Sequence, residues 1–156
     1  MLFLYFAFGY SLAALIWYLN HRFVFHGSLG HLPLFKQYRR LHTLHHQNAY
    51  NRRRNRFIFI PIWGHILLLL ASIPAFVLSP WCWLGCTAFA VVYGYRHYNM
   101  HNGDENSWYA RHHLIHHSIA PDYNFSGVHP IIDMIFGTSF DYAVPAKIKS
   151  SSNDHN

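Results

Sequence analysis

The stretch that decides the fold is MLFLYFAFGYSLAALIWYLN, residues 1–20, which contains no charged side chain. About twenty apolar residues are what an α-helix needs to cross the hydrocarbon core of a bilayer. The stretch has neither the basic start nor the small-x-small cleavage site of a secretory signal peptide. We therefore predict a retained membrane helix here.

A second apolar stretch, residues 57–95, is also free of Asp, Glu, Lys and Arg. It is too long for one membrane crossing and about right for two. Ser79-Pro80 is the expected turn between them. The sequence thus predicts an all-α integral membrane protein with about three transmembrane helices.

The basic residues predict the orientation of these helices. One span followed by a helical hairpin puts residues 21–56 and 96–156 on the same side of the membrane, and all 12 Lys and Arg lie in those two stretches. By the positive-inside rule, this side is the cytoplasm. Arg39, Arg40 and the run Arg52–Arg56 could also receive an acidic protein partner or lipid headgroups.

Composition supports a membrane protein with one domain. The chain has 156 residues, of which 52% are hydrophobic and only 12% charged, against about 25% in an ordinary soluble domain. We assign residues 1–146 to one membrane domain and residues 147–156 to a disordered tail. The net charge of +6 comes with no nucleic-acid-binding motif, so we expect no nucleic acid partner. Cys82 and Cys86 lie in an apolar run and are interpreted as small hydrophobic residues.

Histidine is the residue type that stands out, with 15 copies against 6 Asp plus Glu. Most of the histidines fall into four groups, all on the predicted cytoplasmic side. The groups are His21-x4-His26, His42-x2-His45-His46, His97-x3-His101 and His113-x2-His116-His117. Lone histidines are usually capped or solvated, but grouping at helical spacing on one membrane face is typical of metal ligands.

The spacings have a geometric meaning if these segments are helical. Positions i, i+3 and i+4 share a helix face, so His42, His45 and His46 can converge on one point, as can His113, His116 and His117. His112 is rotated about 100° from its neighbours and is left out of the ligand set. His21 and His26 are roughly 140° apart on an α-helix. Either the helix ends between them or they serve different metals.

The number of imidazoles predicts two metal ions. Structural zinc takes about four ligands and catalytic zinc about three plus water, so the four groups hold more than one ion needs. Imidazole suits iron, zinc, copper and nickel, and ligand type does not choose between them. A metal transporter or storage protein is the alternative. Its ligands should lie near the bilayer midplane, where only His65 falls.

The four histidine groups, in this order, resemble those of the fatty acid hydroxylase and sterol desaturase superfamily of membrane di-iron enzymes. The flanking residues are most similar to fatty acid 2-hydroxylases. The similar segments are His21–His26, Arg56–Pro61, His97–His101, His112–His117 and Asp133–Thr138. The resemblance covers about residues 15–140.

The resemblance implies an enzyme with two iron ions, or zinc in a purified sample, bound in a cytoplasmic helical lobe. The implied ligands are His21, His26, His42, His45, His46, His97, His101, His113, His116 and His117. Such an enzyme uses dioxygen to hydroxylate a lipid acyl chain, with fatty acid 2-hydroxylation as the expected reaction. Sterol or carotenoid hydroxylation or desaturation is the alternative within the superfamily. Because the chain has no room for a fused cytochrome b5 domain, we expect a separate electron donor, cytochrome b5-like or ferredoxin-like.

Acidic residues are candidates for holding the ligands in place. Asp104, Glu105 and Asp133 are the carboxylates best placed in the sequence to accept ligand N–H groups. Loop or helix-capping roles are the alternative for all three.

Overall fold

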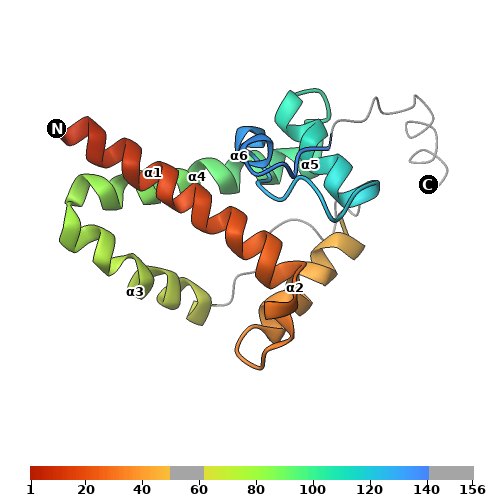
Figure 1. Cartoon of the computed structure of the whole chain (residues 1–156), viewed down its shortest axis with the longest axis horizontal. Helices are drawn as coiled ribbons and strands as arrows, with labels where there is room; N and C mark the ends of the chain where they lie inside the picture. Colours follow the sequence, from red (N-terminus) through yellow and green to blue (C-terminus); the bar gives the residue numbers. More distant parts are fainter. Residues whose placement is uncertain (50–61, 141–156) are drawn as a thin grey trace.

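The computed structural model describes residues 1–49 and 62–140, and this part of the chain is helical without strands, as predicted (Figure 1). The elements are α1 (Leu2–Leu19), a π-helical turn η1 (Asn20–Phe25), a 3-10 turn η2 (Ser28–His31), α2 (Lys36–Gln47), α3 (Ile62–Leu78), α4 (Pro80–Asn102), α5 (Trp108–Ser118) and α6 (Pro130–Ile135).

The first helix has the character of a membrane helix. Together with η1 it forms a continuous apolar segment, Leu2–Phe25, and within the described residues this is the helix long and apolar enough to cross a bilayer. Only 17% of its most apolar window is buried. Phe3, Leu4 and Phe8 are more than half exposed. A core helix of a soluble protein would be covered on its apolar face, so this surface is suited to lipid.

The predicted helical hairpin is present, with its turn at the predicted position. α3 ends at Leu78 and α4 begins at Pro80. Ser79 caps α4, because its Oγ accepts a hydrogen bond from the Trp81 N–H at 3.2 Å, and Pro80 occupies the first helical position, where its missing N–H costs nothing. The beginning of the predicted stretch, residues 57–61, lies outside the described residues.

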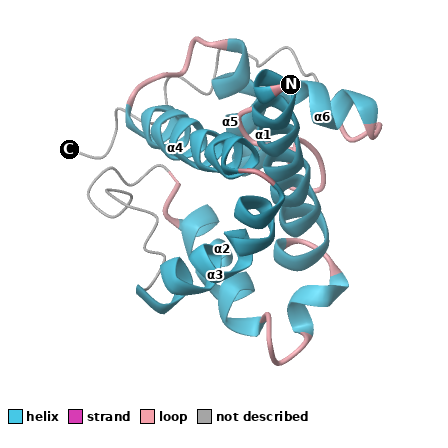
Figure 2. Cartoon of the chain, turned by 90° about the vertical axis from the view of Figure 1, so that its left-hand side faces the viewer, coloured by secondary structure: helices cyan, strands magenta, loops and turns pink. Residues whose placement is uncertain are grey.

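Two glycines allow α1 and α4 to pack closely. A Cβ on Gly9 would overlap the Cys82 carbonyl of α4, and a Cβ on Gly85 would overlap the Phe6 carbonyl of α1. Small residues at helix crossings are a common means of close packing between membrane helices. Figures 1 and 2 both show α4 running beside α1, with α3 to one side of this pair.

Gly85→Ala should therefore destabilise the fold, by about 2 kcal/mol or more, because backbone atoms cannot move aside as a side-chain end can. Gly94→Ala is the matched control on the same helix, since a Cβ there meets nothing within 4 Å. That change should be neutral or slightly stabilising. Thermal unfolding of the two variants in the same detergent measures the difference. Equal melting temperatures would show that α1 and α4 do not pack through Gly85.

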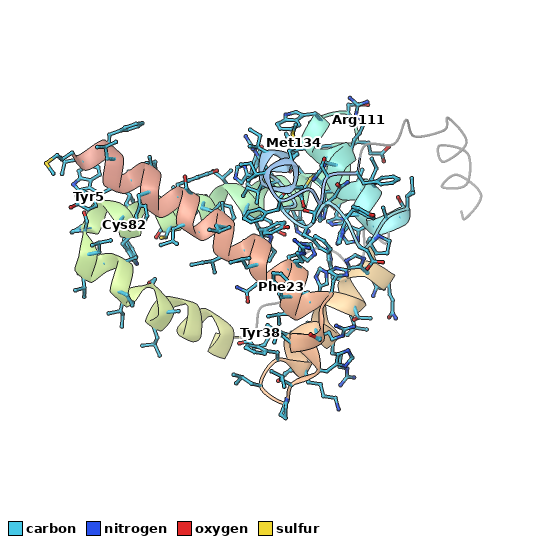
Figure 3. All side chains as sticks on the ribbon, viewed as in Figure 1. Tyr5, Phe23, Tyr38, Cys82, Arg111 and Met134 are labelled. Atoms are coloured by element: carbon cyan, nitrogen blue, oxygen red, sulfur yellow. The ribbon has the colours of Figure 1, made fainter. Side chains whose placement is uncertain are left out.

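Helices α1 and α4 run from the end of the molecule that holds the α3–α4 turn to the other end, where α2 and α5 lie. Buried residues from several elements form the core there: Ala14, Phe89, Tyr93, Met100, Ala110 and Val128. Figure 3 shows nitrogen-bearing side chains crowded at this end and mostly apolar ones along α1 and α3. The chain is thus divided into an apolar helical part and a polar lobe.

Several predictions concern residues that the structure does not describe. The boundary at residue 146, the tail 147–156 and the arginine run Arg52–Arg56 lie outside the described ranges. The two cysteines are free thiols, as expected of small apolar residues, with Cys82 fully buried between the helices.

Candidate metal centre

The ten histidines singled out by spacing are brought together into two groups of five. Within each group the five ligand nitrogens all lie within 4.8 Å of one another. Site 1 consists of His21, His26, His42, His46 and His116, and site 2 consists of His45, His97, His101, His113 and His117. Each group is able to hold one metal ion, which matches the predicted number of two.

A π-helical turn brings His21 and His26 into the same site. The α-helix ends at Leu19, and the His26 N–H then donates to the His21 carbonyl at 3.1 Å, a bond that spans five residues. Residues five apart are neighbours on successive turns of a π-helix, whereas on an α-helix they diverge by about 140°. Neither predicted explanation describes the structure: the α-helix changes into a π-helical turn before His21 instead of ending between the two histidines, and both histidines lie in the same group.

The prediction that each H-x2-HH triple converges on one point is also wrong. His42 and His46 belong to site 1 and His45 to site 2, while His113 and His117 belong to site 2 and His116 to site 1. On an α-helix the i+3 and i+4 side chains lie on opposite sides of residue i, about 100° apart. In both triples the i, i+4 pair stays together and the i+3 residue joins the other site.

The nitrogen–nitrogen distances show that these groups fit metal ions. In site 1, Nε2 of His42 lies 2.9–3.0 Å from Nε2 of His21, His26 and His46. One imidazole nitrogen has a single proton or a single lone pair, so at most one of these three contacts can be a hydrogen bond. Two nitrogens bound to one metal at about 2.1 Å and at right angles are about 3.0 Å apart.

Site 2 repeats this arrangement around His113. Its Nε2 lies 3.1 Å from Nε2 of His101 and 3.0 Å from Nε2 of His117. The two sites are also adjacent, because the rings of His46 in site 1 and His117 in site 2 have centroids only 4.1 Å apart. Two ions bound here would therefore share one partly buried centre.

Backbone carbonyls hold several of the ligands in a defined tautomer. Nδ1 of His116 donates to the Tyr123 carbonyl at 2.7 Å, Nδ1 of His101 donates to the Ala49 carbonyl at 3.0 Å, and Nδ1 of His21 donates to the Phe125 carbonyl. A proton fixed on Nδ1 leaves the lone pair on Nε2, the atom that faces the other ligands. Sequence reasoning did not find these acceptors, because a carbonyl is common to every residue and gives no signal.

The three carboxylates were predicted to accept hydrogen bonds directly from ligand N–H groups, and the contacts of Asp104 and Asp133 are different ones. Asp104 accepts from Ser107 and Tyr109 at the start of α5, in the capping role that was the alternative. The side chain of Glu105 is exposed. Asp133 is fully buried, but its histidine partner is His112 at 2.9 Å, a residue outside both sites, as predicted.

Asp133 instead organises the loop that carries two of the carbonyl acceptors. Its carboxylate accepts from the backbone N–H groups of Phe125 and Ser126 at 2.8 and 2.9 Å and from Thr138 Oγ1 at 2.8 Å. Phe125, whose N–H donates to Asp133, also accepts a hydrogen bond at its carbonyl from Nδ1 of His21. Asp133 therefore acts on the metal ligands through the loop, one step further away than predicted.

Burial keeps the ligands neutral. It lowers the pKa of His46 to about 4 and that of His116 to about 2, with neighbouring histidines adding to the effect. The pKa values of His42, His113 and His117 are held well below the ordinary value by the same causes. Neutral imidazole is the form that binds metals, so the sites are ready for an ion at neutral pH.

These shifts predict how stability depends on pH. In the unfolded chain these histidines take up protons near pH 6.5, whereas in the folded chain His46 takes up a proton only at about pH 4. The unfolded state thus binds more protons over this window, and stability should fall as the pH drops from 6.5 toward 4. Metal loading should strengthen the dependence, because protons compete with the ion.

Thermal unfolding at a series of pH values, with and without added metal, measures this effect. The His46→Gln variant should show a shallower fall without metal, since one titrating group is removed. A melting temperature that is constant from pH 7 to pH 5 would contradict the buried, neutral state of the ligands.

Fold and site together define a class: a helical membrane protein in which a polar lobe, joined to an apolar helical part, carries two five-histidine groups able to bind metal. Comparison with known proteins gives the family. The family model for fatty acid hydroxylases matches residues 6–138, a range that includes all ten histidines. The chain belongs to the fatty acid hydroxylase family.

One similar curated protein is the dihydroceramide fatty acyl 2-hydroxylase FAH2 of Arabidopsis thaliana. It is 29% identical over 146 residues, which cover 85% of this chain and 59% of the relative. The chain thus spans somewhat more than half the length of that relative. No solved structure matches this chain significantly.

Proposed function

We propose that this chain is a membrane di-iron oxygenase that hydroxylates a lipid acyl chain. The observation that carries the proposal is the pair of adjacent five-histidine sites in a member of the fatty acid hydroxylase family. Two iron ions held there would supply the activation of dioxygen, by which a C–H bond, O2, two electrons and two protons give C–OH and water. The electrons come from a separate donor, cytochrome b5-like or ferredoxin-like.

The number of ligands favours iron over structural zinc. Zinc sites are almost always four-coordinate. Each group here offers five histidine nitrogens within 4.8 Å of one another, and imidazole is a ligand that suits iron.

Aromatic residues shelter the centre from water. Phe25 stacks on His42 with ring centroids 4.7 Å apart, and Tyr93 stacks on His97 at 5.2 Å. Trp17 packs against Tyr93 at 4.2 Å, on the side of the membrane helices. These aromatic contacts would limit the access of water to the centre, the carbonyl acceptors leave Nε2 available to a metal, and burial keeps the imidazoles unprotonated, all of which oxygen chemistry requires.

Three spans and a cytoplasmic lobe are the membrane arrangement that we propose. α1 crosses once and the hairpin α3–α4 crosses twice. α3 has 17 residues and α4 has 23, and the last turns of α4 carry His97 and His101 into the lobe. All 12 Lys and Arg lie in the two sequence stretches that also carry the histidines of both sites, which favours the cytoplasmic side. The substrate then enters from the bilayer and the electron donor docks from the cytoplasm.

The substrate class follows from the relative that the chain resembles. Its name, a dihydroceramide fatty acyl 2-hydroxylase, makes an amide-linked acyl chain and carbon 2 the first choice. A site at the membrane surface is compatible with oxidation near the headgroup. Sterol or carotenoid oxidation, or desaturation, is the second choice within the superfamily.

The test is to express the chain in a host without related hydroxylases and to compare total lipids by mass spectrometry with those of a His116→Ala strain. A species one oxygen atom heavier, absent from the variant strain, is the expected result, and fragmentation locates the carbon. A species two hydrogens lighter would identify a desaturase instead. If purified chain supplied with a reductase and ceramides gave neither product, the proposal would be wrong.

A further inference from the structure

An exposed apolar patch lies on the loop between η1 and α2. Leu29, Leu32 and Leu34 are 45%, 48% and 75% exposed. Phe23 in η1 is 44% exposed, and Figure 3 shows it at the end of α1, where this loop begins. Several large apolar side chains exposed within so short a segment mark a surface for interaction.

Basic side chains follow the leucines in the sequence, at the start of α2. An open groove between the loop and α2 is lined by Gly30, His31, Lys36, Arg39, Arg40 and Leu44, among others. Lys36 and Arg40 are exposed. The sequence contains no Asp or Glu before Asp104, so no acidic residue from the first two thirds of the chain can neutralise this surface.

The loop holds these side chains in a fixed relation. Arg39 donates from a guanidinium nitrogen to the Gly27 carbonyl at 2.8 Å, which ties α2 to the start of the loop. Gly30 is buried, and a Cβ there would overlap the Val24 carbonyl, so the loop packs closely on η1. The loop that carries the leucines is therefore held against both η1 and the helix that carries the cations.

The position of the loop suggests its partner. It follows the candidate membrane helix, Leu2–Phe25, and in Figure 1 it projects from the end of α1. In the membrane arrangement proposed above, the chain leaves the hydrocarbon at this point and enters the headgroup layer. An acidic protein would match the cations but not the leucines, whereas an anionic bilayer surface matches both.

We propose that residues 29–40 form a membrane-docking element for anionic phospholipid. Leu29, Leu32 and Leu34 insert into the boundary between headgroups and acyl chains, and Lys36 and Arg40 bind lipid phosphates. Such an element would hold the histidine lobe close to the bilayer, because Arg39 of this element and the site 1 histidine His42 lie on the same helix. The proposal requires the chain to be in a bilayer but does not depend on its activity.

Photo-crosslinking of the full chain in nanodiscs of mixed phosphatidylcholine and phosphatidylserine tests the insertion. A Leu34→p-benzoylphenylalanine variant should form lipid adducts on irradiation, read by mass spectrometry. The same probe at Ser118, exposed at the end of α5, is the control and should form few. Leu34 is largely exposed, so the probe does not disturb the fold.

The charges are tested in the same nanodiscs. With Lys36 and Arg40 present, phosphatidylserine should be enriched among the adducts by at least about threefold over its share of the lipid, since each basic residue near the surface contributes about 1 kcal/mol. The double variant Lys36→Glu, Arg40→Glu should abolish the enrichment while leaving the metal content unchanged.

Two results would overturn the proposal. One is a Leu34 probe that forms no more lipid adducts than the Ser118 probe. The other is adduct formation without preference for phosphatidylserine. If, in addition, reduction by an acidic ferredoxin or cytochrome b5 were lost in the double variant, the surface would belong to the electron donor. Each readout is independent of hydroxylation, so a failure here is distinct from a failure of the proposed activity.

Discussion

His42→Ala and His45→Ala should each remove one metal ion, but from different sites, and each should lower turnover by at least about a hundredfold. The two histidines are on the same helix, three residues apart, yet His42 lies in site 1 and His45 in site 2. Loss of residues that only support a metal ligand costs about 10- to 100-fold in metal affinity or activity, and loss of the ligand itself should cost more.

Metal analysis and lipid turnover of the purified variants check this expectation. Thr43→Ala is the matched control, because Thr43 lies between the two ligands in sequence, is exposed, and bonds only its own helix at the Arg39 carbonyl. It should retain both ions and full activity. If both histidine variants kept two ions per chain, the division of α2 between the sites would be refuted.

Asp133→Asn should lower metal retention by about 10- to 100-fold, although Asp133 touches no ligand. Its carboxylate accepts from two backbone N–H groups, from Thr138 and from His112. The amide nitrogen of asparagine cannot accept a hydrogen bond, so donors that the carboxylate satisfied are left buried without an acceptor. The loop then releases the Phe125 carbonyl that orients His21.

Asp104→Asn is the control for this second prediction, since it makes the same chemical change in a partly exposed helix cap. Iron retention during dialysis against a chelator, with thermal unfolding measured in parallel, separates the two variants. Asp133→Asn should lose iron faster and melt lower, while Asp104→Asn should differ little from the unchanged chain. Equal retention in both would show that the loop does not position the ligands.

Much of the architecture could be predicted because it follows from local patterns. The uncharged run at the N-terminus, the turn at Ser79 and the helical spacing of His42 to His46 each depend on a few neighbouring residues. Helical spacing singled out the ten histidines that the fold brings together into the two groups. The number of metal sites followed from counting imidazoles.

The division of the ligands between the sites was not accessible in this way. His45 and His46 are both compatible with the face of His42, and only the placement of α4 and α5 opposite α2 decides which neighbour each ring meets. The π-helical turn at His21 is a second case, because nothing in the residues 20–25 distinguishes it from a continued α-helix. The carbonyl acceptors are a third, since a backbone group has no signature in sequence.

The carboxylates show why a residue type alone does not define a role. Asp104 and Asp133 are the same residue type, and both follow a group of ligand histidines in the sequence. Burial separates them, because Asp133 is enclosed by donors from three segments, whereas Asp104 caps a helix near solvent. Tertiary packing, rather than position along the chain, makes only one of them important for the site.

The central claim is that the two five-histidine groups hold two iron ions. Its most direct test is the metal content of catalytically active, purified chain, determined by elemental analysis together with iron X-ray absorption. We predict two iron ions per chain in nitrogen-rich, five- or six-coordinate environments. One ion or none per active chain, or four-coordinate zinc alone, would contradict the account.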